Sequence, residues 1–333
     1  MMSRALLRKT LLCLGLGVST SLSPLASHAV EKIRLASTIW AGYGPLYVAD
    51  KLDLYKEHGL KVELQFFSDP GLVVPALASK AVDGATLTYD QVIGAVAKGH
   101  KHKVVMPIDY SNGGDAVVAQ KGIASIRELV GKKVGYAPLS PPEFLLSYAL
   151  KSNGMSEKDI QAININPDAV PGAMASGSLA AGVTWEPNVS RVVAMGGGER
   201  YHVLYSSKDA PGLITDVLVF DEALVAKRGK AIEALIKGYL AGLEYMHTHP
   251  EQSAAIVAEV LGVSAQEATE QMQGVYNMPL AEMGLNFEES DATTSFYGSG
   301  RVIAELMLES GQIPALPDIG STFDSRFIDA LTQ

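Results

Sequence analysis

The alternation of hydrophobic and polar positions predicts a chain in which strands and helices follow one another. Lys32 to Thr38 begins by alternating charged and apolar residues, which is typical of a short strand with one buried face. Similar strand-like and helix-like stretches alternate as far as Phe220. The predicted strands cover residues 32–38, 61–67, 82–88, 103–108, 116–119, 134–136, 163–165, 181–185, 201–205 and 216–220. Repeated strand–helix units of this length indicate a parallel sheet, so we expect an α/β fold.

The predicted helices divide the chain into an early mixed part and a late helical part. Between the strands they cover residues 46–58, 71–79, 90–98, 144–152 and 169–176, with another opened by Glu186 and Pro187. After Phe220 the helical period dominates, over residues 222–248, 250–261, 265–276 and 296–310. The polar, glycine-rich stretch from Asp109 to Asp115 is a hinge candidate. We therefore expect an α/β lobe, a hinge, a second α/β lobe and a helical return.

A glycine turn directly after the first strand is the first candidate for a ligand-binding element. Gly42 and Gly44 allow the backbone to approach a ligand closely, and Pro45 suits the first turn of the helix that follows. Open α/β sheets bind small ligands at such strand–turn–helix junctions. Trp40 and Tyr43 would supply flat walls with polar tips, although both could instead cap the core. The turn lacks the third glycine of a dinucleotide-binding motif.

The first 29 residues have the features of a secretory signal peptide. Arg4, Arg8 and Lys9 form a basic start, residues 11–22 are largely apolar, and residues 27–29 end in a small-x-small cleavage pattern. We expect cleavage after Ala29 and a periplasmic mature protein. The apolar stretch is too short for a membrane anchor.

Composition and charge exclude several classes of function. Cys13 is the only cysteine and lies in the predicted signal peptide, so disulfides, thiolate catalysis and cysteine metal sites are excluded for the mature chain. The remaining 24 Lys and Arg stand against 36 Asp and Glu, a formal net charge of −12. This balance argues against nucleic acid or an anionic membrane as a partner. The histidine pairs at 100 and 102 and at 247 and 249 lack an evident third ligand, so we expect no metal.

The order of these features resembles the periplasmic solute-binding proteins of ABC importers, in the nitrate/sulfonate/taurine (NitT/TauT) family. Four segments carry the resemblance: Trp40–Pro45, Tyr55–Glu63, Ile126–Gly135 and Gly182–Pro187. The resemblance covers essentially the whole mature chain and is specific for the superfamily rather than for a ligand.

The resemblance implies a type II periplasmic-binding-protein fold, with two α/β lobes joined by crossovers near Asp109–Asp115 and Leu213–Val219. Lobe 1 would comprise residues 30–112 and 218–333, with the C-terminal helices, and lobe 2 residues 113–217. A small solute would lie between them, and the closed form would deliver it to an inner-membrane permease with its ATPase. This implies a monomer without catalysis or cofactor.

In that fold the strand ends and helix starts face the cleft. The residues expected there are Trp40, Tyr43, Ser68, Tyr89, Asp90, Asp109, Asn112, Asp115, Glu143, Trp185, Glu186 and Asp216. Neither Lys nor Arg occurs in the short segments that surround these residues in the sequence, whereas six of the twelve residues are acids. Aromatic faces with carboxylates suit a cation or an NH-rich ring, so we expect an amine, a guanidino or urea-like compound, or a pyrimidine. Helix N-termini could still hold a sulfonate, taurine or nitrate.

Other interpretations remain open at this point. Asp90, Glu143 and Glu186 could be helix N-caps, and the hinge aspartates could fix turns. A related group of pyrimidine-forming enzymes shares the fold but uses histidine with a cysteine-rich motif, and this mature chain has no cysteine. The protein could also deliver its ligand to a periplasmic sensor.

Overall fold

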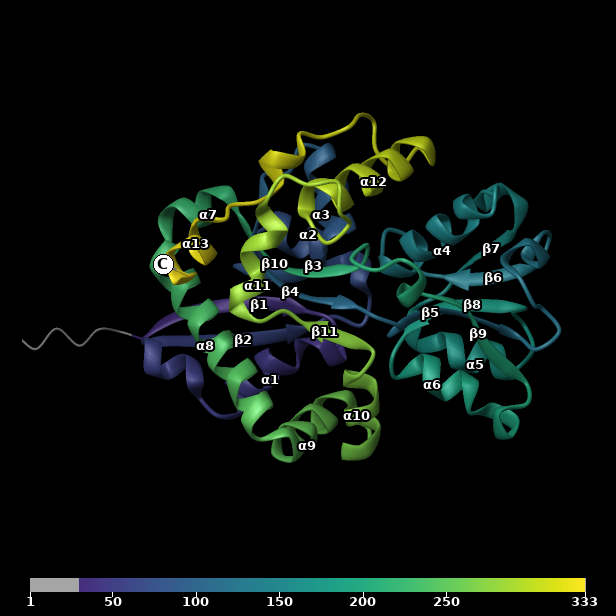
Figure 1. The fold of residues 1–333 in the computed structure, drawn as a ribbon, viewed down its shortest axis with the longest axis horizontal. Helices are drawn as coiled ribbons and strands as arrows, with labels where there is room; N and C mark the ends of the chain where they lie inside the picture. The colour runs from purple at the N-terminus through teal and green to yellow at the C-terminus, as the bar shows by residue number, and fades with distance from the viewer. Residues whose placement is uncertain (1–29, 333) are drawn as a thin grey trace, which may run out of the picture.

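The computed structural model describes residues 30–332, so the predicted signal peptide and Cys13 lie outside the described residues. Two β-sheets lie beside each other along the long axis of the molecule (Figure 1). The larger sheet contains β1 (Glu31–Ser37), β2 (Leu60–Phe66), β3 (Gly84–Thr88), β4 (His102–Ser111), β10 (Thr215–Asp221) and β11 (Val275–Asn277). The smaller sheet contains β5 (Asp115–Gln120), β6 (Lys133–Tyr136), β7 (Gln161–Asn164), β8 (Ala181–Trp185) and β9 (Tyr201–Ser206).

Helices cover both faces of each sheet, as the expected α/β fold requires. The larger sheet carries α1 (Gly44–Lys51), α2 (Val73–Ala78), α3 (Tyr89–Ala97), α7 (Glu222–Lys227), α8 (Gly229–Thr248), α9 (Pro250–Leu261), α10 (Ala265–Met272), α11 (Leu280–Met283), α12 (Phe296–Glu309) and α13 (Arg326–Thr332). The smaller sheet carries α4 (Pro141–Ser152), α5 (Val170–Ala175) and α6 (Asn188–Val193). The α3–α12 pair and the α1–α8 pair lie on opposite sides of the larger sheet (Figure 1). No helix of residues 30–332 is long and apolar enough to cross a membrane.

The chain crosses between the two sheets twice. It leaves the larger sheet after Ser111 and enters the smaller one at Asp115. It returns between Ser206 and Thr215, and Thr215 is the first residue of β10. Ser111 and Ser207 join the two crossings through a hydrogen bond between their hydroxyl groups of 2.7 Å.

The larger sheet is mixed rather than parallel, so the expectation of a parallel sheet is wrong for its centre. β1 is parallel to β2 and β3, but β10 lies between β3 and β4 and is antiparallel to both. The reason is topological, because β10 enters the sheet from the side of the smaller one and must run against its neighbours.

Two predicted helices are shorter in the structure. The helix expected over 46–58 stops at Lys51, because Asp53 takes a left-handed conformation (φ 56°), and a 3₁₀ turn at Leu54–His58 follows. The helix expected over 265–276 stops at Met272. Val275–Asn277 instead pairs with the edge of β4, where a β-branched and an aromatic residue fit the pleated surface.

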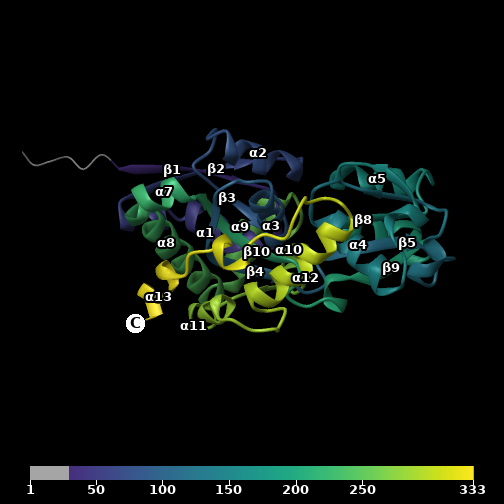
Figure 2. The ribbon, with the colours of Figure 1, turned by 90° about the horizontal axis from the view of Figure 1, so that it is seen from above.

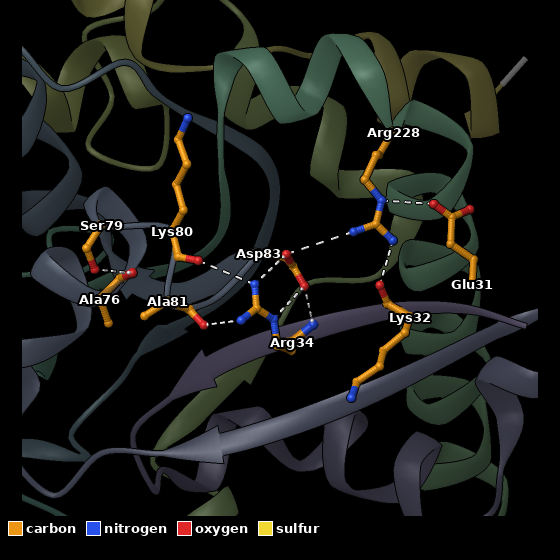
Figure 3. Close-up of polar contacts among 9 residues, drawn as sticks. All are labelled: Glu31, Lys32, Arg34, Ala76, Ser79, Lys80, Ala81, Asp83 and Arg228. Atoms are coloured by element: carbon orange, nitrogen blue, oxygen red, sulfur yellow. Dashed lines mark hydrogen bonds and ion pairs between the residues drawn. The ribbon is translucent and has the colours of Figure 1, made fainter.

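An arginine–aspartate network closes the end of the larger sheet where β1 and β3 begin (Figure 3). Arg34 donates from its backbone N–H (2.8 Å), Nε (3.2 Å) and Nη2 (3.0 Å) to Asp83, and its Nη1 donates to the Ala81 carbonyl (2.5 Å). Arg228 approaches Asp83 within 4.0 Å and donates to Glu31 at 2.9 Å. The network thus links β1, the start of β3 and the α7–α8 junction.

We expect Asp83→Asn to lower the free energy of unfolding by about 2 kcal/mol at neutral pH, since hydrogen bonds to charged groups contribute about 1.5–3 kcal/mol. Burial raises the pKa of Asp83, but hydrogen bonds from Arg34 and the charges of Arg34 and Arg228 outweigh it and lower this pKa overall. The stabilisation is therefore present above the unfolded-state pKa and lost as the pH falls through the folded-state pKa. Urea denaturation from neutral to acidic pH measures this, with the more exposed Glu31→Gln as the milder control. An unchanged difference between wild type and Asp83→Asn at acidic pH would contradict it.

Candidate ligand-binding site

A cavity lies between the two sheets, where the strands of both end or begin. It holds about 400 Å³ of space between atoms, counting the solvent-filled mouth. Its lining residues are Thr38, Trp40, Tyr43, Pro70, Val73, Thr86, Thr88, Gln91, Asp115, Pro141, Trp185, Ile214 and Asp216. Five of the residues expected from the sequence are among them, contributed by the turn after β1, by β5 and β8 of the smaller sheet and by β10 of the larger one: Trp40, Tyr43, Asp115, Trp185 and Asp216.

Strand register places the polar side chains of the cavity next to one another. In the larger sheet Asp216 is paired with Thr88 on one side and with Asp109 on the other. In the smaller sheet Asp115 is paired with Trp185. Directly paired residues of antiparallel strands have Cβ atoms about 4.5–5.5 Å apart. The pairing therefore gathers carboxylates and an indole from four strands around one space.

Asp109 lies behind Trp40 and orients it rather than lining the cavity itself. The indole Nε1 donates to Asp109 Oδ1 at 3.2 Å, and both side chains are buried. Asp109 Oδ2 has no hydrogen-bond partner within residues 30–332. Gly42 allows this contact, because a Cβ at that position would lie 2.3 Å from Oδ2 and 2.4 Å from Nε1. The glycine turn thus serves the packing of Trp40 on Asp109.

Asp216 and Asp109 form a buried acidic pair on adjacent strands. The hydroxyl of Tyr43 donates to Asp216 Oδ1. Burial, with the charge of Asp109, nevertheless raises the pKa of Asp216 far above its usual value. Burial also raises the pKa of Asp109, against the hydrogen bond from Trp40. Like charges on directly paired residues repel each other, which favours the protonated form of one of the two carboxyls.

Asp115 is the carboxylate of the smaller sheet that faces the cavity. Only 4% of its surface is exposed. Burial raises its pKa to about 7, with Asp90 and Glu186 adding repulsion, although the Ser111 hydroxyl partly offsets this. The backbone N–H of Asp115 donates to Ser111 Oγ at 3.1 Å, which fixes the residue at the first crossing.

The two indoles face the space between the sheets. Trp40 is 5% exposed and Trp185 8% exposed. Trp185 also lines an adjoining hollow with Ser68 and Asp168. There the Asn166 side-chain amide donates to the Ser68 carbonyl at 2.8 Å and joins the two parts of the chain.

The other predicted residues lie outside this cavity. Tyr89 turns into the core, where its hydroxyl is hydrogen bonded to Thr322 at 2.7 Å and its ring packs on Phe296. Asn112 is exposed at the first crossing. Glu186 accepts hydrogen bonds from the N–H (3.0 Å) and hydroxyl (2.8 Å) of Ser190, which matches the alternative role at a helix start.

Asp90 and Glu143 line a second cavity on the other side of Gln91. Glu143 accepts a hydrogen bond from the backbone N–H of Leu139 at 2.7 Å, just before α4. Both acids therefore lie between the two parts of the chain but do not face the space between the indoles.

Several lining residues were not expected from the sequence. Thr88 and Gln91 could be predicted from the sequence. A threonine followed three residues later by glutamine is a capping box, and α3 begins with one. That signal marks a helix start facing the crossings. Thr38, Thr86, Pro70, Val73, Pro141 and Ile214 line the cavity without a distinctive pattern.

The lining of the cavity contains acidic side chains but no basic ones. Neither Lys, Arg nor His is among its lining residues, so the described residues give Asp115 and Asp216 no cationic partner there. Within residues 30–332 no group of three or more His, Cys, Asp or Glu is arranged to hold a metal ion. The arrangement can therefore offer carboxylates, hydroxyls and indole faces to a bound molecule.

Comparison with known proteins identifies the family. A candidate binding protein of Brucella abortus is 26% identical over 257 residues, covering 77% of this chain and 79% of that protein. The taurine-binding periplasmic protein of Escherichia coli K12 is 24% identical over 289 residues, covering 82% and 85%. The crystal structure of the periplasmic aliphatic sulphonate-binding protein SsuA of E. coli superposes with a TM-score of 0.70 at 18% identity, covering 90% and 99%. The family model described as NMT1/THI5 like matches residues 40–253, and the chain belongs to this family.

Proposed function

We propose that this protein is the periplasmic solute-binding component of an ABC importer and that it captures a small nitrogenous solute between its two sheets. The solute would be an amine, a guanidino or urea-like compound, or a pyrimidine-type ring. The observation that carries this proposal is the pair of buried aspartates at 115 and 216 in the cavity wall, with Asp109 behind them and no basic side chain among the lining residues.

The energetic argument favours a ligand that brings positive charge or N–H donors. A buried carboxylate is costly unless it is paired, and here the pKa values of all three aspartates are raised. A cation would restore the ionised form of Asp115 and Asp216. The faces of Trp40 and Trp185 suit the same ligand, because indoles are the best cation–π partners.

The transport role has support from the fold and from the relatives. The proposed lobes are residues 30–112 with 218–333 and residues 113–217, which close over the solute as a monomer. The names of two similar proteins describe periplasmic binding of taurine and of aliphatic sulphonates. We propose that the closed form delivers its solute to an inner-membrane permease and that the protein has no catalytic activity.

Those names also support a second candidate, taurine or another sulfonate. Nitrate, the remaining anion of the NitT/TauT resemblance, belongs to the same candidate class. Among the lining donors, the Thr38 hydroxyl is available to such an anion, whereas Thr86 and Thr88 already donate to Ser37 and Gln91. The Gln91 amide likewise donates to the Pro70 and Leu139 carbonyls. Isothermal titration calorimetry with a panel of small amines, amidines, pyrimidines, taurine, alkanesulfonates and nitrate separates the candidates. We expect binding only among the nitrogenous compounds. Binding of sulfonates or nitrate without any response to amines would overturn the ligand class but not the transport role.

We further expect the affinity for a cationic solute to rise between about pH 6 and pH 8. Asp115 has a pKa of about 7 in the free protein, so a cation must displace a proton below that pH. Below this pKa the affinity falls up to about tenfold per pH unit for one displaced proton. Titration at several pH values with a solute that stays cationic measures the slope. Affinity that falls as the pH rises would indicate an anionic ligand instead.

A further inference from the structure

A second cavity lies beside the first and is also shared by the two parts of the chain. It encloses about 670 Å³ including its mouth. Its walls come from α2, α3, the start of α4 and the end of α12, which approach one another in Figures 1 and 2. Gln91 lines both cavities and separates them, since its Nε2 donates to the Pro70 carbonyl (3.2 Å) and the Leu139 carbonyl (3.5 Å).

Asp90 is the buried acidic side chain of this second cavity. Only 4% of it is exposed, and its Oδ1 is buried without a hydrogen-bond partner within residues 30–332. A buried carboxylate oxygen without a partner is costly and calls for an explanation. Burial raises the pKa of Asp90 to about 6, although hydrogen bonds from Thr88 and from the backbone of Asp90 and Gln91 partly offset this.

Glu143 faces the same space from the other part of the chain. It is partly buried, and the neighbouring charge of Asp90 helps burial to raise its pKa. Lys98 and His100 lie exposed at the rim, and no ion pair joins either of them to the two acids within the described chain. The remaining wall is largely apolar and includes Val74, Pro75, Ala95, Leu139, Phe144 and Met307.

We propose that this second cavity binds a small organic cation with an apolar body, such as a primary alkylamine, with its ammonium group between Asp90 and Glu143. The ammonium satisfies the free oxygen of Asp90, and the hydrocarbon part packs on the apolar wall. Asp90 belongs to α3 of the larger sheet and Glu143 to α4 of the smaller one. A ligand that touches both favours their approach, whichever solute the first cavity takes.

The test uses cyclohexylamine as the probe and cyclohexanol as its neutral counterpart. Met307 provides the readout, because its methyl group lies against α3, where a Cβ at Gly94 would come within 2.8 Å of it. None of the residues that line the first cavity is a methionine. In protein labelled with ¹³C at the methionine methyl groups, we expect cyclohexylamine to shift the Met307 signal saturably and cyclohexanol to bind at least about tenfold more weakly.

Matched variants test the assignment of the amine to the second cavity. Asp90→Asn and Glu143→Gln should each weaken the Met307 response at least about tenfold, because each removes a charge-assisted hydrogen bond. Asp168→Asn removes an exposed carboxylate that lines neither cavity and should leave the response unchanged. The proposal is overturned if Met307 does not respond to the amine, if Asp90→Asn and Glu143→Gln both bind as tightly as wild type, or if Asp168→Asn weakens the response as strongly as they do. None of these outcomes bears on solute binding in the first cavity.

Discussion

Asp115→Asn should weaken binding of a cationic solute by about 10- to 100-fold, since a hydrogen bond to a charged group contributes about 1.5–3 kcal/mol. Asp115 is the first residue after the first crossing and is buried beside Trp185. Because the site is buried, water cannot compensate a bound cation for the lost negative charge. Isothermal titration calorimetry with the best amine of the panel measures the loss. The same variant should flatten the dependence of affinity on pH, because the group with a pKa of about 7 is gone.

Asp115→Asn should not lower the free energy of unfolding at neutral pH. A buried aspartate with a raised pKa lowers the free energy of unfolding as the pH rises from about 4 toward 7, because the unfolded chain releases its proton first. Asparagine removes that cost, so the melting temperature at neutral pH should be equal or higher. Asp168→Asn, an exposed carboxylate of the adjoining hollow, is the matched control and should bind normally. Wild-type affinity in Asp115→Asn would remove this residue from the site.

Gly42→Ala should lower the free energy of unfolding by about 3 kcal/mol, combining the usual cost of overpacking with a lost buried hydrogen bond. The new methyl group would lie 2.3 Å from Asp109 Oδ2 and 2.4 Å from Trp40 Nε1, so the indole must move. Because Trp40 is one wall of the first cavity, solute affinity should fall with stability. Chemical denaturation and calorimetry of the same sample measure both effects.

Gly172→Ala is the matched control for that substitution. Gly172 lies in α5, and a Cβ there would meet no atom within 4 Å. Alanine is favoured over glycine in a helix by about 1 kcal/mol, so this variant should be as stable as wild type or more stable. Wild-type stability in Gly42→Ala would contradict the proposed role of the glycine turn in holding Trp40.

The sequence predicts most elements of the fold because each amphipathic pattern records which face is buried. The strand from Lys32 and the helices after Phe220 appear close to the expected places. The position of β10 at the centre of the larger sheet could not be read from the pattern. Its residues are apolar, as in any buried strand, and its antiparallel direction follows from the return of the chain. β11 was missed because an edge strand of three residues depends on its partner.

The sequence predicts only part of the candidate site, because it does not show in which direction each side chain at a helix start points. The last residue of β3 and the first two of α3 are consecutive, yet Thr88 lines the first cavity, Tyr89 enters the core and Asp90 faces the second cavity. Successive side chains of a helix point about 100° apart, because one turn takes about 3.6 residues. Proximity in sequence to a strand end therefore identifies the neighbourhood but not the cavity.

The place of β10 has a consequence for how the chain acquires its structure. The smaller sheet is built from one continuous segment, from Asp115 to Ser206, and all its strand pairings lie within that segment. The larger sheet has a gap between β3 and β4 until Thr215–Asp221 arrives from the far side of that segment. Contacts between distant parts of a chain form slowly. The middle of this polypeptide should therefore mature first, and its two flanks should complete their joint core only afterwards.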